Sequence, residues 1–209
     1  MTDTESKKKL IEMLYESGSI VFDISENSIQ PYQIKLQNLT SQPSMLRFAA
    51  NLFEPLIKEK SFDLIAGPYT DIPLATTISL EFNLPMIFVR PGRKGYGMEK
   101  LIEGYNKPDQ TVAVIDDEIR NVGESLQLIG RLEGSGLKIS SFNILLDREL
   151  GAIELIQKAG YLCHSVLKLN DIFVHQLQTG KISVKQSEKI KEFVQIQRSE
   201  FLSKNPGSS

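Results

Sequence analysis

The sequence predicts an α/β fold, in which a central, mainly parallel sheet is flanked by helices and carries a small N-terminal hood. From about residue 41 onward, short β-branched apolar segments alternate with longer segments whose apolar residues recur at helical spacing. This alternation is typical of a parallel sheet covered on both faces. The first forty residues lie outside it. A chain of 209 residues can bury a sizeable core without a disulfide or a metal.

We expect one domain over residues 1–204, with the hood in about 1–40, the core in about 41–204 and a disordered tail at 205–209. Residues 91–106 are rich in Gly and Lys, which predicts a mobile loop followed by a short hairpin arm. The apolar spacing predicts helices over 6–16, 41–60, 72–82, 126–132, 152–159, 171–178 and 184–201, and strands over 19–24, 29–36, 62–66, 85–89, 111–115, 140–146 and 161–168.

The composition narrows the class of partner. Basic and acidic residues nearly balance, 24 against 26, so neither nucleic acid nor an anionic membrane is expected to bind. The one cysteine, Cys163, lies in an apolar segment typical of a buried core thiol. The N-terminus lacks the apolar core of a signal peptide, and no apolar run is long enough to span a bilayer. We therefore expect a cytoplasmic protein.

Acidic residues directly follow the predicted strand at 111–115. Asp116, Asp117 and Glu118 come first, and a small polar loop with Gly123 and Ser125 leads into the next helix. The start of a helix presents unpaired backbone N–H groups that favour an anion. Open α/β sheets bind their ligands at the carboxyl ends of their strands. Acids beside an anion site suit a ligand that carries a phosphate at one end and hydroxyls or Mg²⁺ beside it.

The stretch 111–125 resembles the phosphoribosyl pyrophosphate (PRPP) motif of type I phosphoribosyltransferases. Five further segments, at 67–76, 88–90, 94–97, 101–104 and 145–149, resemble orotate phosphoribosyltransferases in order and spacing. The resemblance covers roughly residues 10–200. It implies the type I phosphoribosyltransferase fold and the conversion of orotate and PRPP to orotidine 5′-monophosphate and pyrophosphate, with Mg²⁺. It also implies a homodimer whose catalytic loop is shared across the interface.

Two acids are needed for the ribose, and three are present. Gapless spacing selects Asp117 and Glu118 as the pair that contacts the ribose hydroxyls, directly or through Mg²⁺ or water. The alternative pair is Asp116 and Asp117, with one extra residue in the loop. An acidic helix start, favoured by the helix dipole alone, is a third interpretation.

The phosphate loop departs from the family pattern. Arg120, Asn121 and Val122 stand where an apolar residue and two Thr-like residues are usual. Asn121 can still form hydrogen bonds, whereas the Val122 side chain cannot donate one. Glu124 brings a negative charge close to the expected 5′-phosphate, which Arg120 could offset. The residues expected to bind the phosphate are Asn121, Val122, Gly123, Glu124 and Ser125.

The catalytic loop departs further. The family pattern Arg-Lys-Glu-x-Lys-x-His-Gly becomes Arg-Pro-Gly-Arg-Lys-Gly-Tyr-Gly at residues 90–97. Arg90 and the expected catalytic residue Lys94 match. Arg93 could replace a lost cation, since guanidinium suits phosphate well, and Tyr96 stands where the family has histidine. A solvated basic loop is the alternative interpretation.

The residues expected to contact the base also depart from the family pattern. Ser25 stands where the family hood has a lysine, and the loop after Gly67, which carries the expected ligand contact Tyr69, is one residue short. Arg148 keeps the Asp-Arg-Glu context whose arginine approaches the orotate carboxylate. A surface ion pair is its alternative interpretation. Three functions therefore stay open: an orotate enzyme, a phosphoribosyltransferase for another base, and a non-catalytic PRPP- or nucleotide-binding relative.

Overall fold

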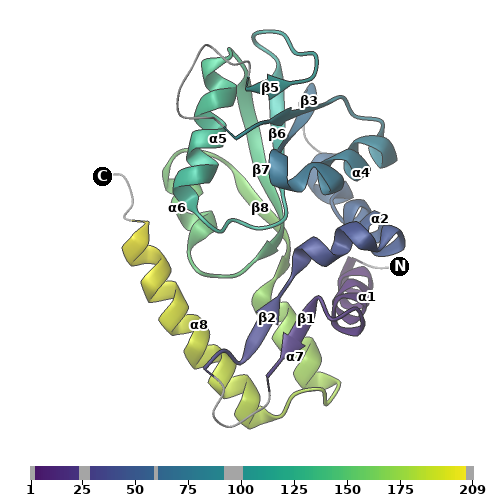
Figure 1. Ribbon diagram of the computed structural model, residues 1–209, viewed down its shortest axis with the longest axis vertical. Helices are drawn as coiled ribbons and strands as arrows, with labels where there is room; N and C mark the ends of the chain where they lie inside the picture. The colour runs from purple at the N-terminus through teal and green to yellow at the C-terminus, as the bar shows by residue number, and fades with distance from the viewer. Residues whose placement is uncertain (1–2, 24–28, 59–60, 92–100, 206–209) are drawn as a thin grey trace.

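A computed structural model describes residues 3–23, 29–58, 61–91 and 101–205 (Figure 1). Its centre is a six-stranded sheet in the order β5-β4-β3-β6-β7-β8. Every neighbouring pair is parallel except β4 and β5, so the mainly parallel α/β prediction is confirmed. The strands are β3 (Leu64–Pro68), β4 (Met86–Val89), β5 (Ile102–Glu103), β6 (Thr111–Asp116), β7 (Lys138–Asp147) and β8 (Cys163–Lys168).

Helices cover the sheet from both sides. Helices α2 (Pro43–Asn51) and α4 (Ile72–Phe82) pack on the face that carries Ala113 and Ile115. Helices α5 (Val122–Gly134) and α6 (Ala152–Lys158) pack on the opposite face, against Val114 and Phe142 (Figure 1). Because β6 contributes alternate residues to both cores, its apolar run is almost continuous, as expected of a central parallel strand. Burial raises the pKa of Cys163 to about 12, as befits a core thiol.

A second, two-stranded sheet lies apart from the central one. It pairs β1 (Ile20–Phe22) with β2 (Tyr32–Ile34) in antiparallel fashion. Helices α1 (Asp3–Glu16), α7 (Leu169–Gln178) and α8 (Val184–Lys204) surround it (Figure 1). The Tyr32 ring packs edge-on against Phe173 of α7 and Phe193 of α8, and its hydroxyl donates to Gln197. These contacts hold β2 against α7 and α8.

Two predicted elements are corrected. The helix expected over 41–60 is divided into α2 and α3 (Glu54–Ile57), and a 3₁₀ turn (Leu36–Ser41) precedes it, beginning where the strand expected over 29–36 was to end. Pro55 lies in the first turn of α3, where its missing N–H is tolerated, but it could not have continued α2 without a clash. The helix expected from residue 126 begins at Val122, because the Asn121 side chain caps it by accepting from the Glu124 N–H.

The order of the strands makes the neighbouring strands β3 and β6 the point of the sheet where the chain connections change direction. From β3 the chain continues into α4 on one face, and from β6 it continues into α5 on the other. The loops after these neighbouring strands therefore diverge, which is where open α/β sheets bind ligands. Gly67 in β3 allows close approach of α4, since a Cβ there would lie 2.9 Å from the Ala75 Cβ. This packing brings the loop after β3 against the end of β6.

Candidate functional site

A cavity of about 780 Å³ opens at the carboxyl ends of β3 and β6. The 3₁₀ turn before α2 contributes Gln37 and Thr40 to its wall. A smaller cavity of about 330 Å³ lies beside it, and Gln37, Glu118 and Arg120 line both. Residues that the larger cavity brings together from separate elements include Tyr69, Asp71, Asp116, Asp117, Ser125 and Arg131.

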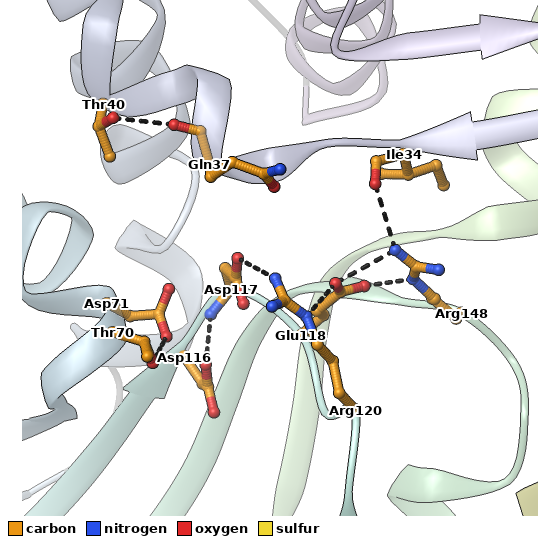
Figure 2. Close-up of polar contacts among 10 residues, drawn as sticks. All are labelled: Ile34, Gln37, Thr40, Thr70, Asp71, Asp116, Asp117, Glu118, Arg120 and Arg148. Carbon is orange, nitrogen blue, oxygen red and sulfur yellow. Dashed lines mark hydrogen bonds and ion pairs between the residues drawn. The ribbon is translucent and has the colours of Figure 1, made fainter. Parts of the chain in front are cut away.

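Three aspartates meet in the larger cavity. One carboxylate oxygen from each of Asp71, Asp116 and Asp117 lies within 4.8 Å of the others (Figure 2). Asp71 comes from the short turn after β3, while Asp116 ends β6 and accepts a hydrogen bond of 2.8 Å from the Asp117 N–H. Burial and the neighbouring charge of Asp71 raise the pKa of Asp117 to about 7. The same two causes raise the pKa of Asp116 well above its usual range.

This donor set fits a hard divalent cation. Carboxylate oxygens are the ligands that Mg²⁺ prefers, and an ion among them would relieve the repulsion that raises these pKa values. Sequence reasoning named Asp117 and Glu118 as the acids near the metal. The structure groups Asp117 with Asp71 and Asp116, and directs Glu118 elsewhere (Figure 2).

Glu118 lies between two arginines on the side of the smaller cavity. Its carboxylate accepts from the Arg120 Nε at 2.6 Å, from the Arg148 Nη2 at 3.1 Å and, in a close contact, from the Arg148 Nε. Arg148 also donates to the Ile34 carbonyl of β2 at 3.4 Å. With a side chain only 2% exposed, Glu118 has both oxygens engaged by guanidinium groups.

Arg120 connects the two groups of acids. Its Nη2 donates to Asp117 at 3.3 Å, while its Nε is held by Glu118 (Figure 2). The aspartates and the arginine-bound Glu118 therefore lie on opposite sides of one guanidinium. Glu118 and Arg120 line both cavities, whereas the three aspartates line only the larger one and Arg148 lines only the smaller one.

The start of α5 forms the edge of the larger cavity. Asn121 is its N-cap, and Ser125 donates from its hydroxyl to the Asn121 carbonyl at 3.4 Å. The N–H of Val122 donates to the Asn205 side chain at 3.3 Å. The residues expected in a phosphate loop are thus gathered at one place, but Val122, Gly123, Glu124 and Ser125 form the first helical turn.

The basic loop is only partly described. Arg93, Lys94 and Tyr96 lie outside the described residues. Arg90 pairs with Glu103 across the β4–β5 ladder at 3.1 Å, and its carbonyl accepts from Arg131 of α5. Tyr69 is 56% exposed at the mouth of the larger cavity.

Sequence reasoning missed several residues of these cavities. Asp71 lies three residues beyond the end of β3, in the turn that follows this strand, and that position was an available signal. Arg131 lies nine residues after Val122 in α5 and belongs to no recognised motif. Asn205 was assigned to a disordered tail, whereas the structure holds its side chain against α5; residues 206–209 lie outside the described residues.

The sheet is mainly parallel, acids follow β6, and the start of α5 lies beside them. A ligand-sized cavity opens where the connections after β3 and β6 diverge. These features together are those of the type I phosphoribosyltransferases. The chain is 31% identical to an orotate phosphoribosyltransferase of Thermococcus gammatolerans over 174 residues, 80% of this chain and 92% of that protein. It is 32% identical to the uridine 5′-monophosphate synthase of Bos taurus over 96% of its own length and 42% of the relative. Among solved structures, Leishmania donovani UMP synthase matches with a TM-score of 0.78 at 28% identity, covering 90% of this chain and 42% of that one.

The chain belongs to the orotate phosphoribosyltransferase family. This membership rests on full-length relatives such as the Thermococcus protein, and no protein-family model matches the chain. The chain spans about two fifths of the bovine relative. Within the described residues, no helix combines the length and apolar character needed to cross a bilayer.

Proposed function

We propose that this chain transfers the phosphoribosyl group of PRPP to orotate, releasing pyrophosphate and forming orotidine 5′-monophosphate. The observation that carries the proposal is the group of buried acids at the end of β6, beside the start of α5, in a family member. Such a reaction needs no nucleophilic side chain. It needs the base positioned, the leaving group neutralised and positive charge at the anomeric carbon stabilised.

In this proposal Asp116 and Asp117 hold the ribose hydroxyls. Both are buried at the carboxyl end of β6 and line the larger cavity, which supports a role on the sugar. Glu118, the partner that gapless spacing selects, already has both oxygens engaged by arginines. This geometry favours the alternative pair. Carboxylates close to the anomeric carbon would also stabilise the oxocarbenium-like charge that develops as pyrophosphate leaves.

Asp71, Asp116 and Asp117 would hold Mg²⁺ in the same cavity. When bound, the ion supplies positive charge to the pyrophosphate of PRPP. The three carboxylates must be deprotonated to hold it, so the raised pKa of Asp117 makes metal affinity depend on pH near neutrality.

The base occupies the smaller cavity in this account. Ile34, Ile119, Leu150 and Phe201 supply apolar surface for a planar ring, and Arg148 supplies charge for a carboxylate. Two arginines against one glutamate leave a net charge of +1 among the described lining residues, which suits one monoanionic base. This balance supports orotate over an uncharged pyrimidine.

The pyrophosphate side would be served by Arg90, Arg131 and the loop that carries Arg93 and Lys94. Arg131 lines the larger cavity and donates to the backbone carbonyl of Arg90, whose chain neighbours Val89 and Pro91 also line that cavity. We also propose a homodimer in which this loop reaches the partner's site. Sedimentation at micromolar concentration tests the dimer, and a monomer there would contradict it. The cytoplasmic location expected from the sequence stays a prediction.

The test is product formation from PRPP and Mg²⁺ with orotate, uracil, adenine and hypoxanthine in parallel. Orotidine 5′-monophosphate formed from orotate alone supports the proposal. Product from another base would assign a different specificity. For variants of the cavity aspartates, Asp109→Asn is the matched control. Asp109 is an exposed aspartate that pairs with Lys138 at 2.7 Å and lines neither cavity.

A non-catalytic binding protein is the second candidate. The observation that favours it is the engagement of expected ligand groups by the chain itself: Glu118 binds Arg148, and Asn205 caps Val122. PRPP binding without product from any base would favour this second candidate.

A further inference from the structure

The C-terminal end of α8 lies against the start of α5. The Asn205 Oδ1 accepts from the Val122 N–H at 3.3 Å, across 83 positions of the sequence. The Val122 N–H is one of the N–H groups that a helix leaves without an acceptor at its first turn. Asn121 occupies another by accepting from Glu124. Two asparagine side chains therefore use donors that would face an anion.

This contact belongs to a broader attachment of α8. Arg198 donates to the Glu149 carbonyl at 2.7 Å and pairs with Glu154 at 2.9 Å. Leu202 packs so closely on Gly151 that a Cβ there would lie 2.8 Å from the Leu202 Cδ2. Phe201 reaches the smaller cavity beside Arg148. The Asn205 Nδ2 donates back to the Phe201 carbonyl at 2.9 Å, which orients its oxygen towards α5.

The Val122 N–H can serve one strong acceptor at a time. A phosphate at this helix start would be drawn by the same N–H groups and by the helix dipole. It therefore has to take the Val122 donor from Asn205, or bind with one donor fewer. The neutral amide oxygen is the weaker acceptor of the two, since charge-assisted hydrogen bonds are the stronger class.

We propose that Asn205 sets the affinity of the phosphate site by competing with the ligand's phosphate for the Val122 N–H. This inference rests on the proposed function and on the expectation, implied by the family resemblance, that the 5′-phosphate of PRPP binds at residues 121–125, the start of α5. Asn205 leaves the Val122 N–H when the phosphate arrives, and it recaps the helix when the product departs. The end of α8 is thus a competing ligand built into the chain.

Calorimetric titration with inorganic phosphate and with PRPP plus Mg²⁺ tests this on three variants. Asn205→Ala removes the competitor, and one net hydrogen bond corresponds to binding that is roughly 2- to 10-fold tighter. Asn205→Asp replaces the competitor with an anion that the helix dipole favours, so affinity should fall about tenfold. Ser203→Ala is the matched control on the same helix, because Ser203 is exposed and bonds only locally, to the Glu200 carbonyl.

Hydrogen exchange at the Val122 amide is the second measurement. In the ligand-free state, Asn205→Ala should lower its protection while the protein stays folded, and saturating phosphate should restore protection. Unchanged affinity and unchanged Val122 exchange in Asn205→Ala would overturn the proposal. Weaker phosphate binding in that variant would also overturn it, by making Asn205 a phosphate ligand. An absence of phosphate binding in every variant would overturn it too.

These outcomes separate the inference from the proposed function. Tighter PRPP binding in Asn205→Ala, without product from wild type, would support the inference and contradict the transferase proposal. Product from wild type, with no change of affinity in Asn205→Ala, would overturn the inference alone.

Discussion

The Glu118 carboxylate accepts hydrogen bonds from Arg148 through both of its oxygens. These bonds use the Nε and Nη2 groups of Arg148, and Nη2 also donates to the Ile34 carbonyl. A base carboxylate would therefore meet the Nη1 edge of a guanidinium whose orientation Glu118 fixes. In the proposed reaction, Glu118 would act on the base through Arg148, whereas Asp116 and Asp117 would hold the sugar.

Glu118→Gln should raise the KM for orotate while leaving the KM for PRPP nearly unchanged. The amide can present an N–H₂ donor at Oε1, where the Arg120 Nε and the Arg148 Nη2 converge, so Arg148 loses its orientation. Charge-assisted hydrogen bonds of about 1.5–3 kcal/mol correspond to an increase of about tenfold or more in the KM for orotate. The KM for PRPP should change less than about twofold. Steady-state kinetics with each substrate varied checks this. An increase confined to PRPP would mean that Glu118 serves the ribose after all.

Asp117 should make the metal-free protein less stable as pH rises. Its folded pKa of about 7 lies above its unfolded value of about 3.9. The folded state therefore binds more protons between these values, and the contribution to stability present below the unfolded pKa is lost as pH rises through 7. Thermal unfolding in EDTA should give Asp117→Asn a higher Tm than wild type at pH 8. The difference should shrink at pH 5. Equal differences at both pH values would contradict this reading of the acids.

Asp71→Asn should weaken Mg²⁺ binding. It removes one of three carboxylates whose oxygens lie within 4.8 Å of one another, and it leaves Thr70 a hydrogen-bond partner. We expect at least a tenfold loss of Mg²⁺ affinity, measured by calorimetry in the presence of PRPP, and a higher Tm without metal because a like charge is removed. Asp109→Asn is the control. Unchanged Mg²⁺ affinity would exclude Asp71 from the metal site.

Restoring two family residues in the basic loop should raise turnover. Pro91 and Tyr96 stand where the resemblance implies a lysine and a histidine. One charge-assisted contact to a phosphate is worth about 1.5–3 kcal/mol, and each ~1.4 kcal/mol of barrier is tenfold in rate. Pro91→Lys combined with Tyr96→His should therefore form orotidine 5′-monophosphate at least tenfold faster. A wild type that is already fast and does not respond would show that Lys94 and the nearby arginines suffice.

Local patterns predicted most of the fold. The run at 111–115 reads as a buried strand because β6 is apolar towards both cores, and the helix over 72–82 was predicted with its observed bounds. Asn121 followed three residues later by Glu124 is a sequence signature of a helix start. The prediction missed it because the segment was interpreted as a phosphate-binding loop. Pro55 was equally visible as a break in the helix expected over 41–60.

The rest depended on tertiary contacts. The sequence gives Asp116, Asp117 and Glu118 as three adjacent acids, and only the fold divides them between Asp71 on one side and Arg148 on the other. The Asn205–Val122 contact joins the C-cap of α8 to the start of α5. Nothing periodic marks such a pair, because its partners are brought together by the packing of α8 on the loop after β7.

The central claim is that Asp116 and Asp117, at the end of β6, hold the sugar of PRPP. The most direct test is calorimetric titration of PRPP, with Mg²⁺ present, into the wild type and three variants: Asp116→Asn, Asp117→Asn and Glu118→Gln. Asp109→Asn is the control. We expect PRPP affinity to fall at least tenfold in both aspartate variants and to stay within about twofold of wild type in Glu118→Gln and in the control. Loss of affinity in Asp117→Asn and Glu118→Gln, with Asp116→Asn unaffected, would contradict this account and restore the gapless pair.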